Sequence, residues 1–355
     1  MSEPLPPRLI ITPGDPDGIG PEIVEKALNR PSIRKLKAQF TIIGAVDRFK
    51  KSSNLFRSSQ VDFITAPLRA PAKQFLAGYQ AGWSIETAAR LCLSGKAQAL
   101  VTGPIDKARL QKGGFPYTGH TDFLADLCQA SSVTMMLAND RLRVSLVTVH
   151  VGIKKVSERL TQSELERTIQ HTRQWLVDSR GVLKPRIAVL ALNPHAGEQG
   201  IFGREEIDVI QPVIDRFNRK GTLELSGPFP ADTFFALHYG SGDVTANRKQ
   251  APYDAVIAMY HDQGLIPVKM TDFERTVNWS LGLPIVRTSV DHGTAFDIAG
   301  QGIASSKSLE AAIEAAYAAV TVSIAVKAGA KSGVKSAIKS QMSKTRSTVK
   351  RMNKQ

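Results

Sequence analysis

The stretch AVIAMYH, residues 255–261, is a continuous apolar run that ends in a histidine. Strands of parallel sheets have such continuous apolar sequences, because helices cover both of their faces. The run therefore predicts a buried strand with His261 at its carboxyl end. Comparable apolar runs occur at residues 9–12, 40–44, 99–102, 144–150 and 186–192.

Amphipathic segments separate these runs, for example residues 84–93 and 165–177. Thr161 and Glu164 have the spacing of a capping box and predict the start of the second helix. Repeated strand–helix alternation predicts an α/β fold with a mainly parallel sheet covered on both faces. The pair Asn139-Asp140 separates two apolar runs and predicts one antiparallel hairpin.

The chain has 355 residues, of which 42% are hydrophobic, so it is long for a single core. We expect a discontinuous first α/β lobe from residues 1–125 and 270–326. Residues 126–269 are expected to form a second α/β lobe. A basic, disordered tail is expected over residues 327–355.

The N-terminal sequence lacks the basic and apolar segments of a signal peptide. The most apolar long stretch, residues 311–326, is interrupted by Glu314 and is too short and too Ala-rich to predict a membrane span. Cys92 and Cys128 form no CxxC motif, which argues against a disulfide framework and a thiolate metal site. These features favour a cytoplasmic protein.

The net charge of +14 is distributed unevenly along the chain. Nine Lys and Arg residues and no acid lie in residues 327–355, which leaves +5 for the rest. A mildly basic body suits an enzyme for anionic substrates and lacks the basic and aromatic clusters of a nucleic-acid-binding module. The tail is interpreted as solvated, with a contact to anionic partners as the alternative.

Three histidines follow apolar runs: His150, His195 and His261. Each is expected near the carboxyl end of a strand, the edge where open α/β sheets bind ligands. Three neutral imidazoles can hold a divalent metal and leave a position for substrate. The alternative for each is an ordinary hydrogen-bonded histidine at a strand end.

A second set of side chains suits anions. Lys269, Asn278 and Arg287 follow the His261 segment, and a guanidinium can bind phosphate or carboxylate with two hydrogen bonds. The alternative is surface ion pairing. His120 and Thr121 lie on a turn that opens a helix, where amides bind anions. The alternative there is capping of a helix over residues 122–129.

The opening TPGDPDGIGPE, residues 12–22, places glycines between a strand and a helix, with Pro21 suited to the first helical turn. Its spacing differs from G-x-G-x-x-G, so it does not predict a Rossmann domain.

Seven segments together resemble the 4-hydroxythreonine-4-phosphate dehydrogenase family of pyridoxal phosphate biosynthesis. They are GDPDGIGPE (14–22), VTGPIDK (101–107), GHTDF (119–123), NPHAGE (193–198), PADT (230–233), AMYHDQGLIPVK (258–269) and TSVDHGTAFDIAG (288–300). The resemblance runs from about residue 9 to residue 326.

The resemblance implies a two-lobed α/β/α sandwich related to the isocitrate and isopropylmalate dehydrogenases, without a Rossmann domain. It implies a homodimer whose active site lies at the subunit interface, so that both chains contribute, with the dimer and metal-site elements in the second lobe, residues 126–269. It also implies NAD or NADP and one divalent cation, such as Zn, Mg, Co or Mn. The implied metal ligands are His150, His195 and His261. The implied substrate contacts are His120, Thr121, Lys269, Asn278 and Arg287.

The implied reaction is oxidation of 4-phosphohydroxy-L-threonine at C3, giving a β-keto acid that decarboxylates to 3-amino-2-oxopropyl phosphate. Asp232 and Asp262 are candidates for the proton acceptor, against roles in helix capping or in supporting a metal ligand. Cofactor-binding residues are not assigned by any motif, although the turn at residues 293–300 is a candidate.

The chain departs from the family pattern at Asp17, at Asp122, in the long polar segment 239–252 and in the basic tail. Asp17 and the long segment put the substrate in question more than the reaction type. The alternatives are a related dehydrogenase acting on D-threonate or D-erythronate 4-phosphate, a three-histidine metallohydrolase, and nucleic-acid binding through the tail.

Overall fold

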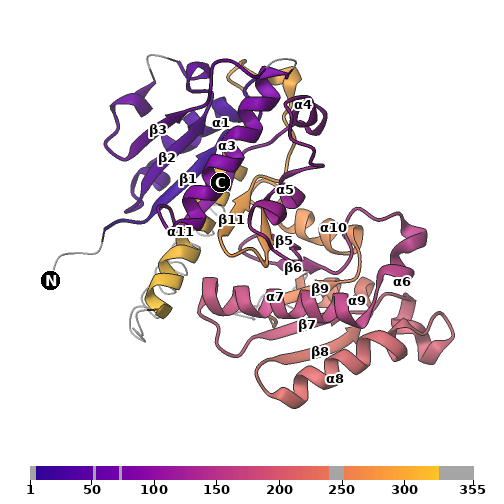
Figure 1. Cartoon of the computed structure of the whole chain (residues 1–355). Helices are drawn as coiled ribbons and strands as arrows, with labels where there is room; N and C mark the ends of the chain where they lie inside the picture. Colours follow the sequence, from indigo (N-terminus) through magenta and orange to yellow (C-terminus); the bar gives the residue numbers. More distant parts are fainter. Residues whose placement is uncertain (1–4, 51–52, 72–73, 240–251, 328–355) are drawn as a thin grey trace. The chain divides into compact units, whose positions relative to one another are not determined.

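The computed structural model describes residues 5–50, 53–71, 74–239 and 252–327. The expectations for residues 240–251 of the long polar segment and for the tail beyond residue 327 lie outside these ranges. The chain divides into two compact units (Figure 1). Unit 1 comprises residues 1–133 and 277–321, and unit 2 comprises residues 134–276 and 322–355.

Unit 1 contains strands in the order β3-β2-β1-β4-β11-β10. All neighbouring strands in this order are parallel except β11 and β10. The strands are β1 (Arg8–Thr12), β2 (Gln39–Gly44), β3 (Val61–Thr65), β4 (Ala99–Thr102), β10 (Val277–Leu281) and β11 (Val286–Ser289). The helices are α1 (Gly20–Leu28), α2 (Pro31–Arg34), α3 (Leu76–Leu93), α4 (Lys107–Lys112), α5 (His120–Leu127) and the greater part of α11 (Lys307–Lys327), with short turns η1 (Val46–Arg48), η2 (Asn54–Arg57) and η7 (Phe296–Ile298).

Helix α3 covers one face of the unit 1 sheet (Figure 1). Ile85 and Ala88 of α3 pack in one buried cluster with Ile10, Ile43 and Leu100 from three different strands. Further along the sheet, Thr288 of β11 donates a hydrogen bond of 3.0 Å to the carbonyl oxygen of Ala312 in α11. Strands β1, β2 and β4 therefore have the buried, helix-covered character that their apolar sequences predict, whereas β3 is partly exposed.

Unit 2 contains strands in the order β5-β6-β9-β7-β8. Only β5 and β6 are antiparallel. The strands are β5 (Thr134–Ala138), β6 (Arg143–Leu146), β7 (Arg186–Leu190), β8 (Glu224–Phe229) and β9 (Ala255–Ala258). The helices are α6 (Val156–Arg159), α7 (Gln162–Arg180), α8 (Gln211–Lys220), α9 (Ala231–Tyr239) and α10 (His261–Thr271), with shorter turns η3 (Ile153–Lys155), η4 (Pro194–Gly200) and η5 (Glu206–Ile210).

Helices α7 and α10 lie on opposite faces of the unit 2 sheet. Thr172 of α7 donates a hydrogen bond of 2.7 Å to the hydroxyl of Ser145 in β6. Gly264 of α10 faces Val144 and Leu146, the two neighbours of Ser145, so closely that a Cβ would lie under 3 Å from either side chain. Because side chains alternate between the faces of a strand, the two helices must be on different sides.

The expected α/β class with mainly parallel strands is confirmed by this architecture. The hairpin at Asn139 is confirmed as well, since its Oδ1 accepts hydrogen bonds from the amides of Arg141 and Leu142 between antiparallel strands β5 and β6. Thr161 caps α7 by accepting from the amide of Glu164 at 3.2 Å. Pro21 occupies the first turn of α1, as expected.

The start of α5 differs from the expectation. The helix begins at His120, two residues before the expected Asp122, and its cap residue is Gly119. Gly119 has an extended backbone and no side chain with which to cap, so the alternative role of Thr121 as the helix cap is wrong. Thr121 instead lies in the first helical turn with its side chain exposed.

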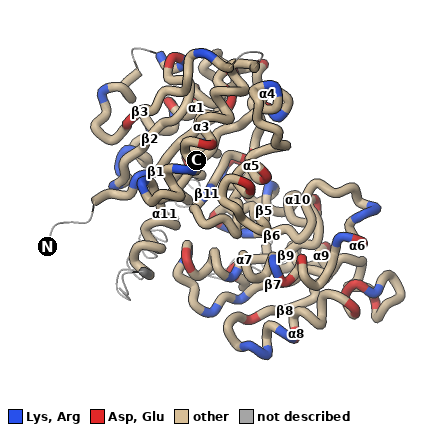
Figure 2. Tube along the Cα trace, in the orientation of Figure 1, with Lys and Arg blue, Asp and Glu red and all other residues tan. Residues whose placement is uncertain are grey.

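Helix α11 is, within the described ranges, the one helix long and apolar enough to cross a membrane. Half of its apolar window is buried in the protein, and core helices of soluble proteins have the same property. Acidic and basic residues are interspersed along the chain in both units (Figure 2). The body of the chain therefore has no extended segment of a single charge in this view.

Candidate metal and substrate site

The three histidines predicted to bind metal follow three neighbouring strands of unit 2. The parallel pairing of β6 with β9, and of β9 with β7, brings the carboxyl ends of these strands to one edge of the sheet. His150 lies just beyond β6, His195 lies in η4 beyond β7, and His261 is the first residue of α10 after β9. In open α/β sheets this edge is where ligands bind.

Two side chains hold these strand ends together. Thr148 donates from its hydroxyl to the carbonyl oxygen of Met259 at 2.8 Å, which joins the His150 segment to the His261 segment. Gln263 accepts from the amide of Met259 and donates to the carbonyl oxygen of Ala191, both at 2.7 Å. The sequence interpretation missed both residues, although each lies two positions from a candidate histidine.

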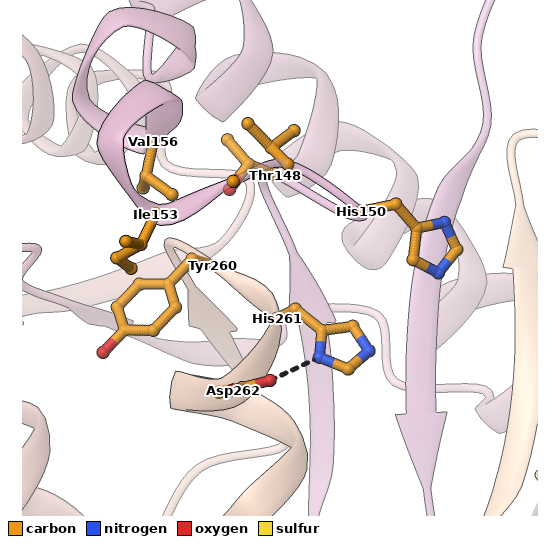
Figure 3. A pocket seen from close by; sticks show the side chains of 9 residues that line it. Thr148, His150, Ile153, Val156, Tyr260, His261 and Asp262 are labelled. Carbon is orange, nitrogen blue, oxygen red and sulfur yellow. Dashed lines mark hydrogen bonds and ion pairs between the residues drawn. The ribbon is translucent and has the colours of Figure 1, made fainter.

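The rings of His150 and His261 lie side by side, with centroids 5.9 Å apart (Figure 3). Two imidazoles that bind one cation through bonds of about 2.1 Å have centroids about 5–6 Å apart, so the pair fits a shared metal. Figure 3 shows that the His261 nitrogen on the side away from Asp262 faces the His150 ring.

A cavity of about 360 Å³ adjoins these two histidines. Its lining residues come from both strand ends and include Thr148, Ile153, Val156 and Tyr260. A neighbouring cavity of about 740 Å³ also reaches His150. The space beside the histidine pair is therefore large enough for a small ligand.

Asp262 supports one of the two rings directly. Its Oδ1 lies 2.7 Å from Nδ1 of His261. A carboxylate in this position keeps the proton on Nδ1 and leaves Nε2 as the nitrogen for a metal. The geometry therefore favours the role of supporting a metal ligand over that of proton acceptor for Asp262.

His195 has a different setting. Its ring lies 6.1 Å from that of Phe202, measured between centroids, and its side chain is exposed. Both His195 and His150 have φ of +51°, a left-handed conformation that costs an ordinary residue about 1–2 kcal/mol. Such conformations persist where the surrounding structure enforces them, and they cluster at functional sites.

No three His, Cys, Asp or Glu side chains are grouped as metal ligands within the described parts of this single chain. The structure thus brings His150 and His261 together and places His195 apart from them on its own turn. The complete three-histidine ligand set stays a prediction.

Unit 1 holds a buried guanidinium. Arg287 in β11 is only 3% exposed and donates to the hydroxyls of Ser280 at 2.9 Å and Thr102 at 2.7 Å. Its Nε has no hydrogen-bond partner within the described residues. Burial lowers the pKa of Arg287 to about 9. A buried cation held by neutral hydroxyls, with a donor left over, is suited to bind an anionic ligand.

His120 lies near this guanidinium and is affected by it. Burial of the ring, and then the positive charge of Arg287, hold the pKa of His120 well below its usual value. The Nε2 atom of His120 is buried and has no hydrogen-bond partner among the described residues. A neutral imidazole beside a buried guanidinium can donate or accept one hydrogen bond to a bound ligand.

The remaining predicted substrate contacts are divided between the units. Asn278 lies in β10 opposite Ser289 of β11, and Thr121 lies in α5, so both belong to unit 1 with His120 and Arg287. Lys269 lies in the last turn of α10 in unit 2, with its Nζ 5.7 Å from the ring centroid of Phe273.

Asp232, the other candidate proton acceptor, is the second residue of α9 and is exposed. In the first turn its charge interacts favourably with the helix dipole, which is the more ordinary role for an acid there.

Asp17 sits in a charged cluster within unit 1. It forms ion pairs with Arg48 at 2.7 Å and with Arg109. The Arg109 guanidinium lies between two aromatic rings, 4.8 Å from the centroid of Phe75 and 4.9 Å from that of Phe296. This cluster joins the opening turn of the chain to the segment 293–300, the candidate cofactor turn.

The chain is similar to a well-defined set of known proteins. The family model described as pyridoxal phosphate biosynthetic protein PdxA matches residues 20–316. A 4-hydroxythreonine-4-phosphate dehydrogenase of Trichlorobacter lovleyi is 42% identical, and the match covers 86% of this chain and 96% of that protein.

Solved structures agree with this similarity. The crystal structure of a 4-hydroxythreonine-4-phosphate dehydrogenase from Klebsiella pneumoniae is 35% identical and matches with a TM-score of 0.77, covering 90% of this chain and 99% of that one. A terephthalate 1,2-cis-dihydrodioldehydrogenase from Burkholderia xenovorans LB400 is 28% identical, with a TM-score of 0.61 and coverage of 88% and 97%. Similar folds thus occur in dehydrogenases that are named for different substrates.

Proposed function

Because the chain belongs to the PdxA family of pyridoxal phosphate biosynthetic proteins, we propose that it oxidises 4-phosphohydroxy-L-threonine at C3. The product is a β-keto acid that loses CO2 to give 3-amino-2-oxopropyl phosphate. The observation that carries the proposal is the similarity to a relative named for this dehydrogenase activity. The two chains are 42% identical, and the match covers 96% of the relative's length. We place the reaction in the cytoplasm.

His150, His195 and His261 are the proposed metal ligands. The 5.9 Å spacing of the His150 and His261 rings, and the support of His261 by Asp262, fit a cation bound by imidazole nitrogens. When bound, the metal would polarise the C3 oxygen, and NAD or NADP would accept the hydride. The chain's own contribution is to hold the rings at the sheet edge through Thr148 and Gln263.

Arg287 and His120 are proposed to bind an anionic group of the substrate. Support comes from the two buried nitrogens, Nε of Arg287 and Nε2 of His120, which have no hydrogen-bond partner in the described structure. An anion that accepts from Arg287 would offset the cost of burying its charge. Thr121, Lys269 and Asn278 complete the proposed substrate contacts.

A homodimer with both chains contributing to each active site is the proposed assembly. Helix α10, which begins with His261, exposes Ile266 and Met270 at fractions of 59% and 82%, and Phe273 just beyond the helix is 66% exposed. The His195 turn is followed by exposed Ile201 and Phe202. Exposed apolar side chains beside candidate ligands suit a surface that a second copy covers. On this proposal His195 reaches the His150–His261 pair of the other subunit.

The first test follows NADH or NADPH formation by purified protein stripped of metal with EDTA. The substrates are 4-phosphohydroxy-L-threonine and D-threonate 4-phosphate, each with and without added divalent cation. Metal-dependent turnover of the first substrate supports the proposal. Preference for the second would keep the reaction type and change the substrate, in line with the substrate diversity of similar folds. Absence of reduction with either substrate would overturn the dehydrogenase proposal and favour a metallohydrolase.

A further inference from the structure

The turn that carries His195 has a left-handed backbone over five consecutive residues. The φ angles of residues 195–199 are +51°, +53°, +78°, +43° and +57°. Only one of these residues, Gly197, is a glycine, so the other four occupy a conformation that L-residues disfavour. At the end of the turn, Ile201 donates to the carbonyl oxygen of Glu198 and Phe202 donates to that of Gly197. Such a backbone persists where the surrounding structure enforces it.

The buried carboxylate of Glu206 provides that support. Its Oε1 accepts hydrogen bonds from the amides of Leu192 and Asn193, at 2.8 and 2.9 Å. Its Oε2 accepts from the side-chain amide of Asn193 at 3.0 Å. Glu206 is only 4% exposed. Among the described residues, no Lys, Arg or His forms an ion pair with it. Both of its oxygens therefore accept hydrogen bonds from amide groups of the segment that leads into the histidine turn.

Glu206 also lies against the middle of the turn. A Cβ on Gly197 would lie 2.6 Å from Oε2 of Glu206, so the carboxylate occupies the place where a side chain would otherwise extend. The same carboxylate thus contacts the segment two residues before His195 and the residue two positions after it. A substitution at Glu206 is therefore expected to alter the backbone both before and after His195.

The position of Glu206 is itself well anchored. It begins η5, a π-helical turn that leads directly into α8. Ile210, at the end of this turn, is fully buried, and α8 buries Val213 and Ile214 beyond it. Single π-helical turns are often retained at functional sites because they redirect a side chain at a cost in helix geometry.

We propose that Glu206 is a positioning residue that presents His195 to the metal. The inference rests on the proposed function, because it takes His195 to be a metal ligand. Glu206 acts through the backbone amides of residues 192–193 and through the close approach to Gly197, without touching metal or substrate itself.

Metal affinity tests this role in the full-length protein. Zn²⁺ is titrated against a chromophoric chelator with wild type, Glu206→Ala and Glu206→Gln. The alanine variant is expected to bind Zn²⁺ at least about 10-fold more weakly, as changes in residues that orient ligands commonly do. The glutamine variant should lie between, because its carbonyl oxygen can still accept from the two backbone amides while its NH2 faces the amide of Asn193.

Glu22 offers a matched control. Its carboxylate likewise accepts from two backbone amides, those of Gly302 and Ala304, but it lies in unit 1. Glu22→Ala is expected to lower the melting temperature and to change Zn²⁺ affinity by less than about twofold. Equal loss of affinity in Glu22→Ala and Glu206→Ala would mean a general stability effect and would overturn the proposal.

Hydrogen exchange in metal-free protein separates this inference from the proposed function. Glu206→Ala should speed exchange of the amides of residues 192–202, whereas Glu22→Ala should leave them unchanged. Unchanged exchange and unchanged Zn²⁺ affinity in Glu206→Ala would overturn the positioning role. Wild type that binds no Zn²⁺ would instead overturn the metal site of the proposed function, and the exchange data would still decide whether Glu206 holds the turn.

Discussion

The carboxylate of Asp262 lies 2.7 Å from Nδ1 of His261, on the adjacent residue of the same helix. The contact fixes which ring nitrogen of His261 faces His150 (Figure 3). One short interaction thereby selects the tautomer that suits a metal ligand. On the proposed function, Asp262 supports a metal ligand, a role that requires no proton transfer to or from substrate.

Asp262→Asn should weaken metal binding by about 10-fold and leave kcat near the wild-type value once metal is saturating. The amide can still contact His261, but it lacks the charge that makes the ring a better ligand. Metal titrations and turnover at saturating metal measure the two effects separately. Asp272→Asn is the control, because Asp272 ends the same helix and accepts from the amide of Arg275. If turnover at full metal occupancy fell by about two orders of magnitude, Asp262 would instead be a proton acceptor.

The proposed homodimer with shared active sites predicts complementation between two inactive variants. His195→Ala and His261→Ala should each lose metal and activity as homodimers while keeping the fold, which circular dichroism checks. Co-expressed with different affinity tags, they should form mixed dimers with one intact site, and hence about half the wild-type activity. Mixed dimers without activity would contradict a site that takes His195 from one subunit and His261 from the other. His171→Ala, which removes a histidine bonded to Thr134 at 2.9 Å, is the control.

Removal of the buried guanidinium of Arg287 should weaken substrate binding more than it slows the chemical step. Arg287→Ala is expected to raise KM by about 10- to 100-fold, since charge-assisted hydrogen bonds contribute about 1.5–3 kcal/mol. Arg287→Lys keeps the charge and loses the two-pronged geometry, so its KM should lie between. Inorganic phosphate should raise the melting temperature of wild type and not of Arg287→Ala. An equal rise in the melting temperature of both proteins would contradict anion binding by Arg287. The control variant is Arg90→Ala, because Arg90 is exposed and, among the described residues, forms an ion pair only with Glu86.

The lowered pKa of His120 predicts a pH dependence of stability. Below about pH 6.5 the unfolded chain binds a proton at His120 that the folded protein does not bind. The free energy of unfolding should therefore fall as the pH decreases through this range. In His120→Gln the free energy of unfolding should fall less steeply with decreasing pH. The difference in slope corresponds to about one proton fewer taken up on unfolding. Urea unfolding at pH values on either side of about 6.5 measures the difference, and identical slopes would contradict the burial of a neutral ring.

Local sequence patterns predicted much of the fold, because the strands are buried on both faces. Continuous apolar runs located β1, β2, β4, β6, β7 and β9. The runs at residues 144–150 and 186–192 overestimated their strands, which end at Leu146 and Leu190. Hydrophobicity continues past the last ladder hydrogen bond there because the chain stays buried until it reaches the sheet edge.

The support of the candidate site could not be predicted from local patterns. Gln263 and Glu206 act by hydrogen bonds to the backbone of residues 191–193, which are distant in sequence. An isolated Gln or Glu in a helix has a solvated surface as its ordinary environment. Likewise, the burial of Arg287 between Ser280 and Thr102 depends on which strands become neighbours, and periodicity does not determine that order.

The division of the chain into units has a consequence for its biosynthesis. Strands β10 and β11 belong to unit 1 but follow the whole of β5 to β9 in the chain. A ribosome synthesises a protein from its N-terminus at about 5–20 residues per second. The sheet of unit 1 therefore stays incomplete during synthesis. One edge of β4 has no partner strand until β11 has emerged from the ribosome. The strands of unit 2 come from one contiguous stretch, so this unit can complete its sheet first, although it begins later.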